Sequence, residues 1–443
     1  MAANTSWAAL GKATDLRNRI LFTLGLLIVY RLGTFIPVPG IDGAALRDFM
    51  EQAGQGIGGM VSMFTGGALG RMGIFALGIM PYISASIIVQ LLSSMVPALE
   101  QLKKEGEQGR KKINQWTRYG TVVLATFQAY GLSVGLYAND FVSADIDQSF
   151  FIASCVITLV GGTMFLMWLG EQITARGIGN GISLIIFAGI IAEMPKAIFN
   201  LISQARTTSV NVAFVVAIAA MVIALVVFIV FMERSQRRLL IQYPKRQQAH
   251  GVAQGQKSFL PLKINTSGVI PPIFASSLLL MPLTISQFAG QTVAGESALG
   301  DFVLTLNQYL SHGSPVYMLL YGLGIVFFCF FYTAVVFNPE ETADNLKRNG
   351  GFIPGIRPGK NTEHYLDYVL TRITVIGAAY LAFICLVPEF AIARAGIPFY
   401  LGGTSLLIVV NVTVDTVTQI QSHLLAHQYG DLIKKAKLKG RLR

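Results

Sequence analysis

The sequence predicts an all-α polytopic membrane protein with ten transmembrane helices in two inverted five-helix halves. Three observations lead to this class. Of the 443 residues, 53% are hydrophobic and only 13% are charged, whereas soluble domains carry roughly 25% charged residues. The mean hydropathy is +0.56, and the apolar residues are gathered in runs of about 20 residues, the length that a helix needs to cross a bilayer. One apolar phrase also occurs twice, in segments that lie five expected spans apart.

Each expected helix corresponds to one apolar run, and the runs are separated by shorter polar or glycine-rich stretches. A positively charged stretch precedes the first run, but no small-residue cleavage site follows it, so the run is expected to remain as a membrane helix. The expected spans are 20–39, 74–97, 117–137, 150–170, 181–203, 210–232, 266–289, 315–337, 371–391 and 400–422.

The basic residues predict the orientation of these spans. Lys and Arg are enriched in cytoplasmic segments of membrane proteins, and ten crossings place both termini on one side. If that side is the cytoplasm, it receives all but six of the 34 Lys and Arg residues. The six on the other side are Arg31, Arg47, Arg71, Lys196, Arg206 and Arg394. Both termini are therefore expected in the cytoplasm.

Two internal repeats predict the inverted arrangement. GIMPYISASIIV at Gly78–Val89 and GVIPPIFASSLL at Gly268–Leu279 align at a constant offset of 190 residues. GISLII at Gly181–Ile186 and GTSLLI at Gly403–Ile408 align at an offset of 222. The first repeat pairs spans 2 and 7 and the second pairs spans 5 and 10. Because five is odd, the second half enters the membrane upside down relative to the first, as in many transport proteins.

Such repeats place the functional site at their interface, on helices that are broken near the middle of the membrane. Pro81 and Pro271 break the first repeated phrase, because proline removes a backbone donor and bends a helix. Isoleucines four residues apart share a helix face beside these breaks. The isoleucines concerned are Ile79 and Ile83, and Ile182 and Ile186; Ile83 aligns with Ile273, and Ile186 aligns with Ile408.

The glycine-rich segment 54–73, between spans 1 and 2, contains a short apolar core. Met60, Val61, Met63 and Phe64 lie close together among glycines, and this core is too short to cross the membrane. The segment is either an ordinary outer loop or a half-helix that dips back into a funnel beside span 2, where protein or water surrounds it. The concentration of apolar residues favours the half-helix.

An ion-coupled secondary transporter is the main alternative, because such proteins also use inverted five-helix repeats. Transporters bury ionisable residues at mid-membrane, yet the repeated segments contain none and Asp415 is the nearest candidate. An enzyme is disfavoured. Gly177-x-Gly179-x-Gly181 lies between two membrane helices rather than after a strand, and His423 and His427 lack a third metal ligand. The sequence thus predicts no catalytic residue, cofactor or metal.

Several long stretches resemble the SecY family, the central subunits of the bacterial protein-conducting channel, and the resemblance covers essentially the whole chain. The stretches are GIMPYISASIIVQLL, KKEGEQGRKKINQWTRYGT, FLMWLGEQITARGIGNGIS, GVIPPIFASS, FCFFYTAVVFNPEETADNLKRNGGFIPGIRPG and FYLGGTSLLIVV. None of them is a short motif that recurs by accident.

The resemblance implies a central hourglass pore between the halves 1–205 and 206–443. Its waist is expected at six isoleucines, namely Ile79, Ile83, Ile182, Ile186, Ile273 and Ile408. The resemblance makes 60–70, including Gly66 and Gly67, a plug on the outer side of the waist. It also makes spans 2 and 7 the lips of a lateral gate, at Ser84, Ile87, Leu91, Ser276 and Leu280.

The resemblance further implies docking partners for the cytoplasmic loops 234–263 and 338–372. These loops are expected to bind the ribosome and the motor ATPase SecA, with Arg357 critical for the motor. The stretch KRQQAHG has His250 and Gly251 where the family often has further arginines, so ribosome contacts are expected at Lys245 and Arg246. SecE and SecG are the small membrane partners that the resemblance implies, and the bacterial inner membrane is the location.

Overall fold

The computed structural model describes residues 14–43, 46, 65–138, 141–142, 146–207, 212–243, 247–248, 251–252, 257–279, 314–395 and 402–440. Its helices account for most of these residues. They are α2 (Thr14–Gly33), η1 (Leu69–Arg71), α5 (Met80–Met95), α6 (Pro97–Lys104), α7 (Glu107–Ala138), α8 (Gln148–Arg176), α9 (Gly181–Thr207), α10 (Val212–Arg234), α13 (Pro315–Val336), α14 (Pro339–Arg348), α15 (Lys360–Ala395) and α16 (Gly403–Gly440). A shorter apolar helix runs from Ile270 to Leu279 and is called the 270–279 helix below.

Each of the ten expected spans overlaps a helix in the described part of the chain. Seven helices there are long and apolar enough to cross a membrane, and α5 with α6, bent by 103°, makes up to eight. The remaining two expected spans correspond to α2 and the 270–279 helix. α7 and α15 begin earlier than expected, at Glu107 and Lys360. The expected spans covered only the apolar runs, whereas the charged residues that precede each run are also helical.

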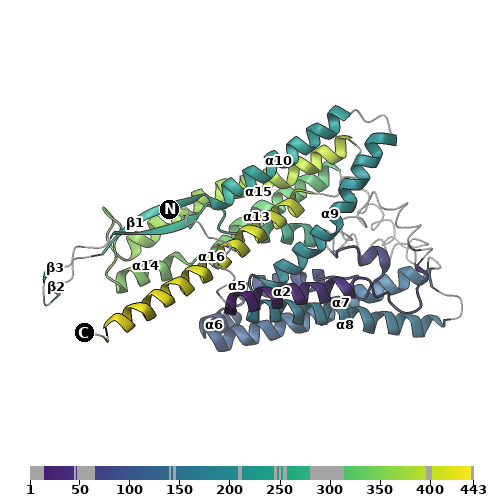
Figure 1. Ribbon diagram of the computed structural model, residues 1–443, viewed down its shortest axis with the longest axis horizontal. Helices are drawn as coiled ribbons and strands as arrows, with labels where there is room; N and C mark the ends of the chain where they lie inside the picture. The colour runs from purple at the N-terminus through teal and green to yellow at the C-terminus, as the bar shows by residue number, and fades with distance from the viewer. Residues whose placement is uncertain are drawn as a thin grey trace.

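The helices form two groups that meet along α9 and α16 (Figure 1). In one group α7 packs against both α5 and α8, and in the other α13 packs against α15. α16 contacts α9, α10, α15 and α2, so it touches helices from both parts of the chain. One large hydrophobic core, which includes Ile83, Leu166, Ile325 and Ile408, extends through both groups. The interface between the groups is therefore part of the core.

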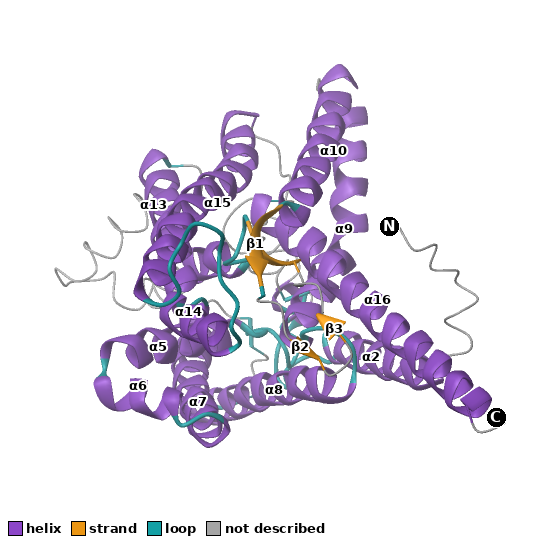
Figure 2. Cartoon of the chain, turned by 90° about the vertical axis from the view of Figure 1, so that its left-hand side faces the viewer, coloured by secondary structure: helices purple, strands orange, loops and turns teal. Residues whose placement is uncertain are grey.

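The loop 234–263 contains β-structure, which the all-α expectation did not include. β1 (Gln236–Gln242) pairs antiparallel with β4 (Lys257–Lys263), and the two-residue strands β2 (Gln247–Gln248) and β3 (Gly251–Val252) pair near the tip. The polar and apolar residues of these strands do not follow a helical period, which is why a ladder forms instead. Viewed from the left-hand end of Figure 1, the strands lie in front of the centre of the helical assembly (Figure 2).

The two cytoplasmic loops of the sequence analysis fold together. The amide of Gln242 donates to the carbonyl oxygen of Phe352, and the amide of Phe352 donates back, each at 2.9 Å. A separate apolar cluster, which includes Leu239, Ala343 and Leu366, joins β1 to α14 and α15. The loops therefore form one small domain, called the loop domain below.

The first sequence repeat is also a repeat of backbone conformation. Gly78 and Gly268 both have positive φ angles, +57° and +64°. α5 starts at Met80 and the 270–279 helix starts at Ile270, so each helix begins two residues after its glycine. A left-handed residue before a helix favours glycine, which has no Cβ to clash. The repeated glycine thus sets the direction in which each helix leaves the preceding segment.

The second repeat places two further glycines in equivalent contacts. A Cβ on Gly181 would collide with the carbonyl oxygen of Gly170 in α8, and a Cβ on Gly403 would collide with that of Ile384 in α15. α9 and α16 therefore each start pressed against the backbone of the helix that precedes them. Side chains larger than hydrogen do not fit at these two positions.

Substituting Gly162 is expected to destabilise the protein, because this position in α8 also carries a close backbone contact. A Cβ on Gly162 would collide with the carbonyl oxygen of Ile74. Gly161 is a matched control, since a Cβ there meets nothing within 4 Å. We expect Gly161→Ala to leave the thermal unfolding midpoint in detergent unchanged or slightly raised, because alanine favours helix by about 1 kcal/mol over glycine. Gly162→Ala should lower it, and equal midpoints would contradict the close approach.

Candidate pore constriction and gate

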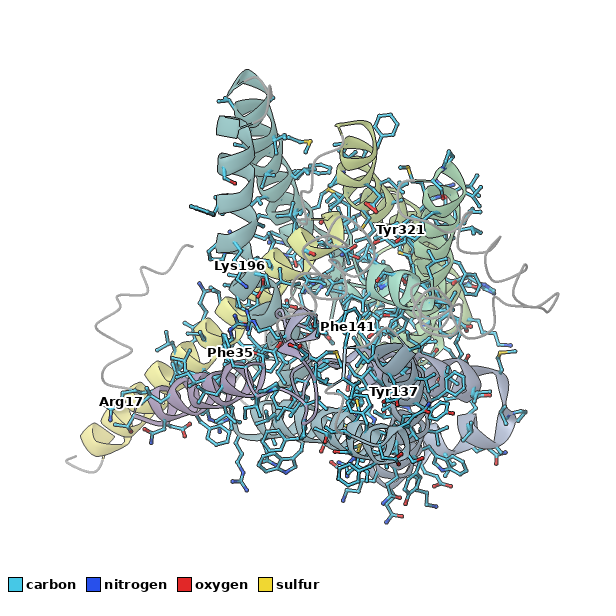
Figure 3. All side chains as sticks on the ribbon, turned by 90° about the vertical axis from the view of Figure 1, so that its right-hand side faces the viewer. Arg17, Phe35, Tyr137, Phe141, Lys196 and Tyr321 are labelled. Carbon is cyan, nitrogen blue, oxygen red and sulfur yellow. The ribbon has the colours of Figure 1, made fainter. Side chains whose placement is uncertain are left out.

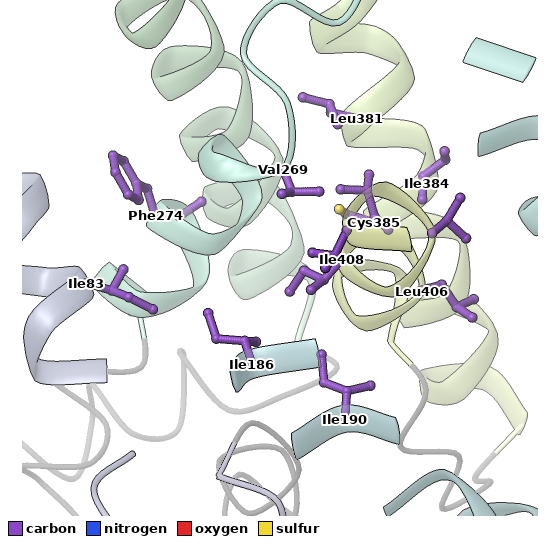
Figure 4. Packing of buried hydrophobic residues seen from close by; sticks show 14 of the residues in the cluster. Ile83, Ile186, Ile190, Val269, Phe274, Leu381, Ile384, Cys385, Leu406 and Ile408 are labelled. Atoms are coloured by element: carbon purple, nitrogen blue, oxygen red, sulfur yellow. The ribbon is translucent and has the colours of Figure 1, made fainter. Parts of the chain in front are cut away.

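A small apolar cavity lies where the two groups of helices meet. Its walls come from α5, α9, the 270–279 helix and α16, and Figure 4 shows Ile83, Ile186 and Ile408 approaching one another from three of these elements. The accessible volume is about 10 Å³, which is about the room that one water molecule needs. The lining residues are Ile79, Met80, Ile83, Ile186, Ile273, Ser276, Ser277 and Ile408.

Five of the six isoleucines expected at a pore waist line this cavity. Ile408 is 1% exposed, and Ile79, Ile83 and Ile186 are no more than 8% exposed. Ile273 is partly buried and packs against the same core. β-Branched side chains have restricted χ1 angles, so a set of isoleucines around a space of this size forms a narrow apolar closure.

Ile182 is the expected waist residue that does not line the cavity. It lies in the first turn of α9, where its Cγ1 is 3.0 Å from the position of a Cβ on Gly170. The close approach of α8 to the start of α9 therefore turns this side chain toward α8. The sequence pattern placed Ile182 and Ile186 on one helix face but did not show where along that face the cavity ends.

α5 and the 270–279 helix meet at the cavity, along a line called the seam below, and four of the five expected gate residues belong to these two helices. Ser84 and Ile87 on α5 are 8% and 4% exposed, and Ser276 on the other helix is 3% exposed. Leu91 is partly buried and packs against the core, whereas Leu280 lies outside the described residues. The seam is thus closed at the level of the cavity.

One polar contact crosses this seam, where the hydroxyl of Ser277 donates to the sulfur of Met80 at 3.9 Å. A second polar contact joins the same two groups of helices between α6 and α13. Nζ of Lys103 in α6 donates to the carbonyl oxygen of Val335, in the last turn of α13, at 3.4 Å. Both contacts are weak, and a cation at a helix C-terminus contributes typically less than 1 kcal/mol at an exposed site. Met80 and Ser277 were missed from the sequence, although both belong to the repeated phrase.

The expected plug segment is described only at its C-terminal end. Met60, Val61, Met63 and Phe64 lie outside the described residues. Gly66 and Gly67 have φ angles of +66° and +80°, and the carbonyl oxygen of Gly66 accepts a hydrogen bond from Arg31 at 2.6 Å. The end of the segment is therefore fixed to α2.

A second, polar cavity of about 270 Å³ lies between the same groups of helices. Asn180, just before α9, and Ser183 of α9 line it together with Asn411 and Gln419 of α16. Asp415, the residue closest to the expectation for a secondary transporter, also lines it. Its side chain is 53% exposed and pairs with Lys263 at 3.8 Å. An exposed, paired carboxylate does not have the buried setting typical of a transporter site.

The loop domain presents Arg357 at its surface. Arg357 is exposed and sits in a turn between Gly355 and Gly359, whose φ angles are +83° and +106°. The hydroxyl of Thr362 donates to the carbonyl oxygen of Arg357 at 3.0 Å, so the backbone of this turn is anchored to α15. Lys245 and Arg246 lie outside the described residues, between β1 and β2. Within the described ranges, no group of three His, Cys, Asp or Glu residues could hold a metal ion.

The helical assembly, the apolar closure between its two parts and the seam beside it define a channel-type polytopic membrane protein. The SecY family model matches residues 73–417. Protein translocase subunit SecY of Vibrio cholerae serotype O1 is 56% identical over 96% of both chains, and that of Escherichia coli K12 is 53% identical over 98% of this chain and 97% of the relative. The chain belongs to the SecY family.

Solved structures share the fold at low sequence identity. A structure of a protein-conducting channel has a TM-score of 0.64 and 18% identity, and covers 91% of both chains. Sec61 from the canine ribosome–channel complex of the endoplasmic reticulum has a TM-score of 0.62, 19% identity and the same coverage. These likenesses show that the chain shares the fold of these channels.

Proposed function

We propose that this chain is the channel-forming subunit of a protein translocase. It passes unfolded polypeptides across the membrane and releases apolar segments sideways into lipid. The observation that carries the proposal is the cavity closed by Ile79, Ile83, Ile186, Ile273 and Ile408 at the meeting of the two helix groups. Such a closure gates by dewetting and makes no directed hydrogen bonds, so it accepts any passing sequence.

The two halves of the channel are residues 1–205 and 206–443 in this proposal. The paired glycines support this division, since Gly78 and Gly268 each lie two residues before a helix and Gly181 and Gly403 are each the first residue of one. α5 and the 270–279 helix are the two lips of the lateral gate. A segment of about 20 apolar residues prefers hydrocarbon to a wet pore, so it leaves through this seam once the lips part.

Residues 54–73 form the plug in this proposal, seated against the outer side of the closure. The contact of Gly66 with Arg31 supports it, because it holds the end of the segment beside the start of α5. The loop domain is the docking surface for the ribosome and SecA, through Lys245, Arg246 and Arg357. SecE and SecG are the membrane partners.

The proposed location is the bacterial inner membrane with both termini in the cytoplasm, as the distribution of Lys and Arg indicates. We assign no catalytic residue to this chain, so the energy for translocation comes from a partner. A direct test reconstitutes the purified complex in liposomes with motor ATPase, ATP and a client protein. Client bearing a signal sequence should become protected from protease, and client without one should not. Saturable flux of a small solute with no protection of client would instead indicate a secondary transporter.

Locking the seam is expected to abolish lateral opening. Met80 and Ser277 lie on opposite lips, and the sulfur of Met80 contacts the hydroxyl of Ser277. Cysteine is shorter than methionine and a direct disulfide needs close Cβ atoms, so Met80→Cys with Ser277→Cys should be joined by a short thiol-reactive cross-linker that contains a reducible disulfide. Signal-dependent protection of client should fall to background and return when a reductant is added. Each single-cysteine variant is the control, and the native cysteines Cys155, Cys329 and Cys385 are buried and unpaired. Unchanged release with the cross-link formed would place the gate elsewhere.

A further inference from the structure

The segment that precedes α5 is tied to the end of α2. We call residues 65–71 the α5 root. The hydroxyl of Tyr30 donates to the carbonyl oxygen of Thr65 at 3.3 Å, and Nη1 of Arg31 donates to that of Gly66 at 2.6 Å. Tyr30 and Arg31 both lie in the last turn of α2. A hydrogen bond from a charged donor is stronger than a neutral one, so Arg31 makes the firmer of the two contacts.

Glu193 of α9 holds the same root from the other side. Its carboxylate lies 3.8 Å from Nη2 of Arg31, 3.7 Å from Nη2 of Arg71 and 3.3 Å from Nζ of Lys196, and its side chain is only 18% exposed. The guanidinium groups of Arg31 and Arg71 also lie over the ring of Phe35, at 4.9 and 4.3 Å from its centroid. Phe35 and Lys196 are labelled in Figure 3, which views the molecule from the right-hand end of Figure 1.

This cluster accounts for an exception in the charge pattern. Arg31, Arg71 and Lys196 are three of the six basic residues that fall on the side opposite the termini. All three gather around Glu193. Their position away from the basic side is therefore explained by a shared carboxylate and by contacts to the α5 root.

The segment that precedes the 270–279 helix is tied in the same way to the end of α10. We call residues 263–268 the 270–279 root. The side-chain amide of Asn265 donates to Oε1 of Glu233 at 2.5 Å and to the carbonyl oxygen of Gly268 at 3.1 Å. Glu233 lies in the last turn of α10 and is 7% exposed. A buried carboxylate requires such a partner, so the contact fixes Asn265 in place.

A carboxylate from the last membrane helix completes the second tether. Oδ1 of Asp415 in α16 lies 3.8 Å from Nζ of Lys263. Glu193 lies twelve residues after Gly181, where α9 begins, and Asp415 lies twelve residues after Gly403, where α16 begins. The carboxylates thus occupy the same position in the second repeat, and each pairs with a cation in the root of a gate helix.

We propose that these contacts form a duplicated tether and that its strength sets how easily a signal sequence opens the channel. Each root is held by the last turn of the preceding membrane helix and by the equivalent carboxylate on α9 or α16. When a tether is loosened, the gate helix moves away from its partner at a lower cost. The inference rests on the proposed function, because only a lateral gate has lips to hold.

The two tethers are expected to differ in strength. The side chain of Glu193 is 18% exposed and has three cations around it, whereas Asp415 and Lys263 are 53% and 60% exposed. Exposed ion pairs contribute little to stability, and removing one partner from a less exposed cluster leaves uncompensated charge. Glu193→Gln should therefore have a larger effect than Asp415→Asn.

The test compares two clients in the reconstituted complex, one with its full signal sequence and one with a shortened apolar core. Glu193→Gln should raise the relative protection of the weak-signal client about fivefold, and Asp415→Asn should raise it about twofold. Asp15→Asn is the matched control, because it breaks an ion pair with Arg19 at 3.3 Å within α2, away from both roots. It should leave the ratio unchanged.

A charge exchange at the second tether separates positioning from general damage. Lys263→Glu and Asp415→Lys should each relax the requirement for a strong signal, and the double variant should restore it. This comparison tests the tether even if Glu193→Gln fails to fold. An unchanged ratio in Glu193→Gln and Asp415→Asn, or a double variant that folds but stays relaxed, would overturn the tether. If the unsubstituted complex protects no client even with a full signal, the proposed function fails instead.

Discussion

Ile186→Ser is expected to make the resting channel leak ions. Ile186 is 7% exposed and lines the cavity closed by the isoleucines. Removing its buried side chain forfeits about 1.5–3 kcal/mol of apolar burial, which corresponds to a ten- to hundredfold rise in the wetted state. The serine hydroxyl also gives water a hydrogen-bonding partner in a space that already has room for about one molecule. Potassium efflux from proteoliposomes, without client or motor, measures the leak.

The control for this prediction lies on the same helix. Ile191 is 39% exposed and does not line the cavity, so Ile191→Ser introduces the same hydroxyl away from the closure and should leave efflux at the level of the unsubstituted channel. Ile182→Ser tests the one expected waist residue that the structure turns toward α8. Equal efflux from Ile186→Ser and Ile191→Ser would show that the cavity is not the barrier.

The repeats made much of this fold predictable from sequence. Gly78 and Gly268 can be recognised as equivalent from the sequence, because a position with a left-handed backbone conformation before a helix favours glycine. Gly181 and Gly403 are readable because no side chain fits against the backbone of α8 or α15. Positions with such strict steric demands retain the same residue in both copies. The repeats also drew attention to the isoleucines, and the family resemblance implied a common waist for them; five of these residues line one cavity.

Other features depend on packing that a one-dimensional pattern does not contain. Ile182 shares a helix face with Ile186, but whether it reaches the cavity depends on how closely α8 approaches Gly181. Met80 and Ser277 both line the cavity, although the repeat does not align them with each other. Met80 supplies a long side chain and Ser277 a short one, so together they fill the same space. The joining of the two loops into one domain depends on a bridge between Gln242 and Phe352, which lie more than a hundred residues apart.

The tethers show a further limit of the sequence argument. Asp415 was the residue to examine for ion coupling, since it is ionisable and lies in a membrane helix. The structure pairs it with Lys263 and places its counterpart, Glu193, beside Arg71. A carboxylate that recurs at the same position of both copies is explained by a structural role common to both. The offset of 222 residues already aligns Glu193 with Asp415 in the sequence, but the cations that each carboxylate contacts are known only from the structure.

Arg357→Glu is expected to reduce translocation driven by the motor ATPase at least tenfold while leaving the channel folded. The guanidinium of Arg357 is exposed, and its turn is fixed by Thr362 and by two glycines with positive φ. A rigid turn presents its side chain to a partner with little loss of conformational freedom. Reversing a charge at a complementary interface costs at least about 1.4 kcal/mol, which is about tenfold in affinity. ATP-dependent protection of client should fall by that factor or more.

Arg348 provides the matched control for this experiment. It is an exposed arginine in the last turn of α14, within the same loop domain, so Arg348→Glu makes the same change in net charge at a different point of the surface. If nonspecific attraction between a basic loop domain and an acidic partner drove docking, both variants would lose activity equally and high salt would mimic them. If Arg357 makes a specific contact, Arg348→Glu should retain most activity. A tenfold higher concentration of motor ATPase should then restore Arg357→Glu if the contact serves only binding. The defect should persist if the contact is needed after binding. The dependence of protection on motor concentration therefore separates a weakened encounter from a failed coupling step.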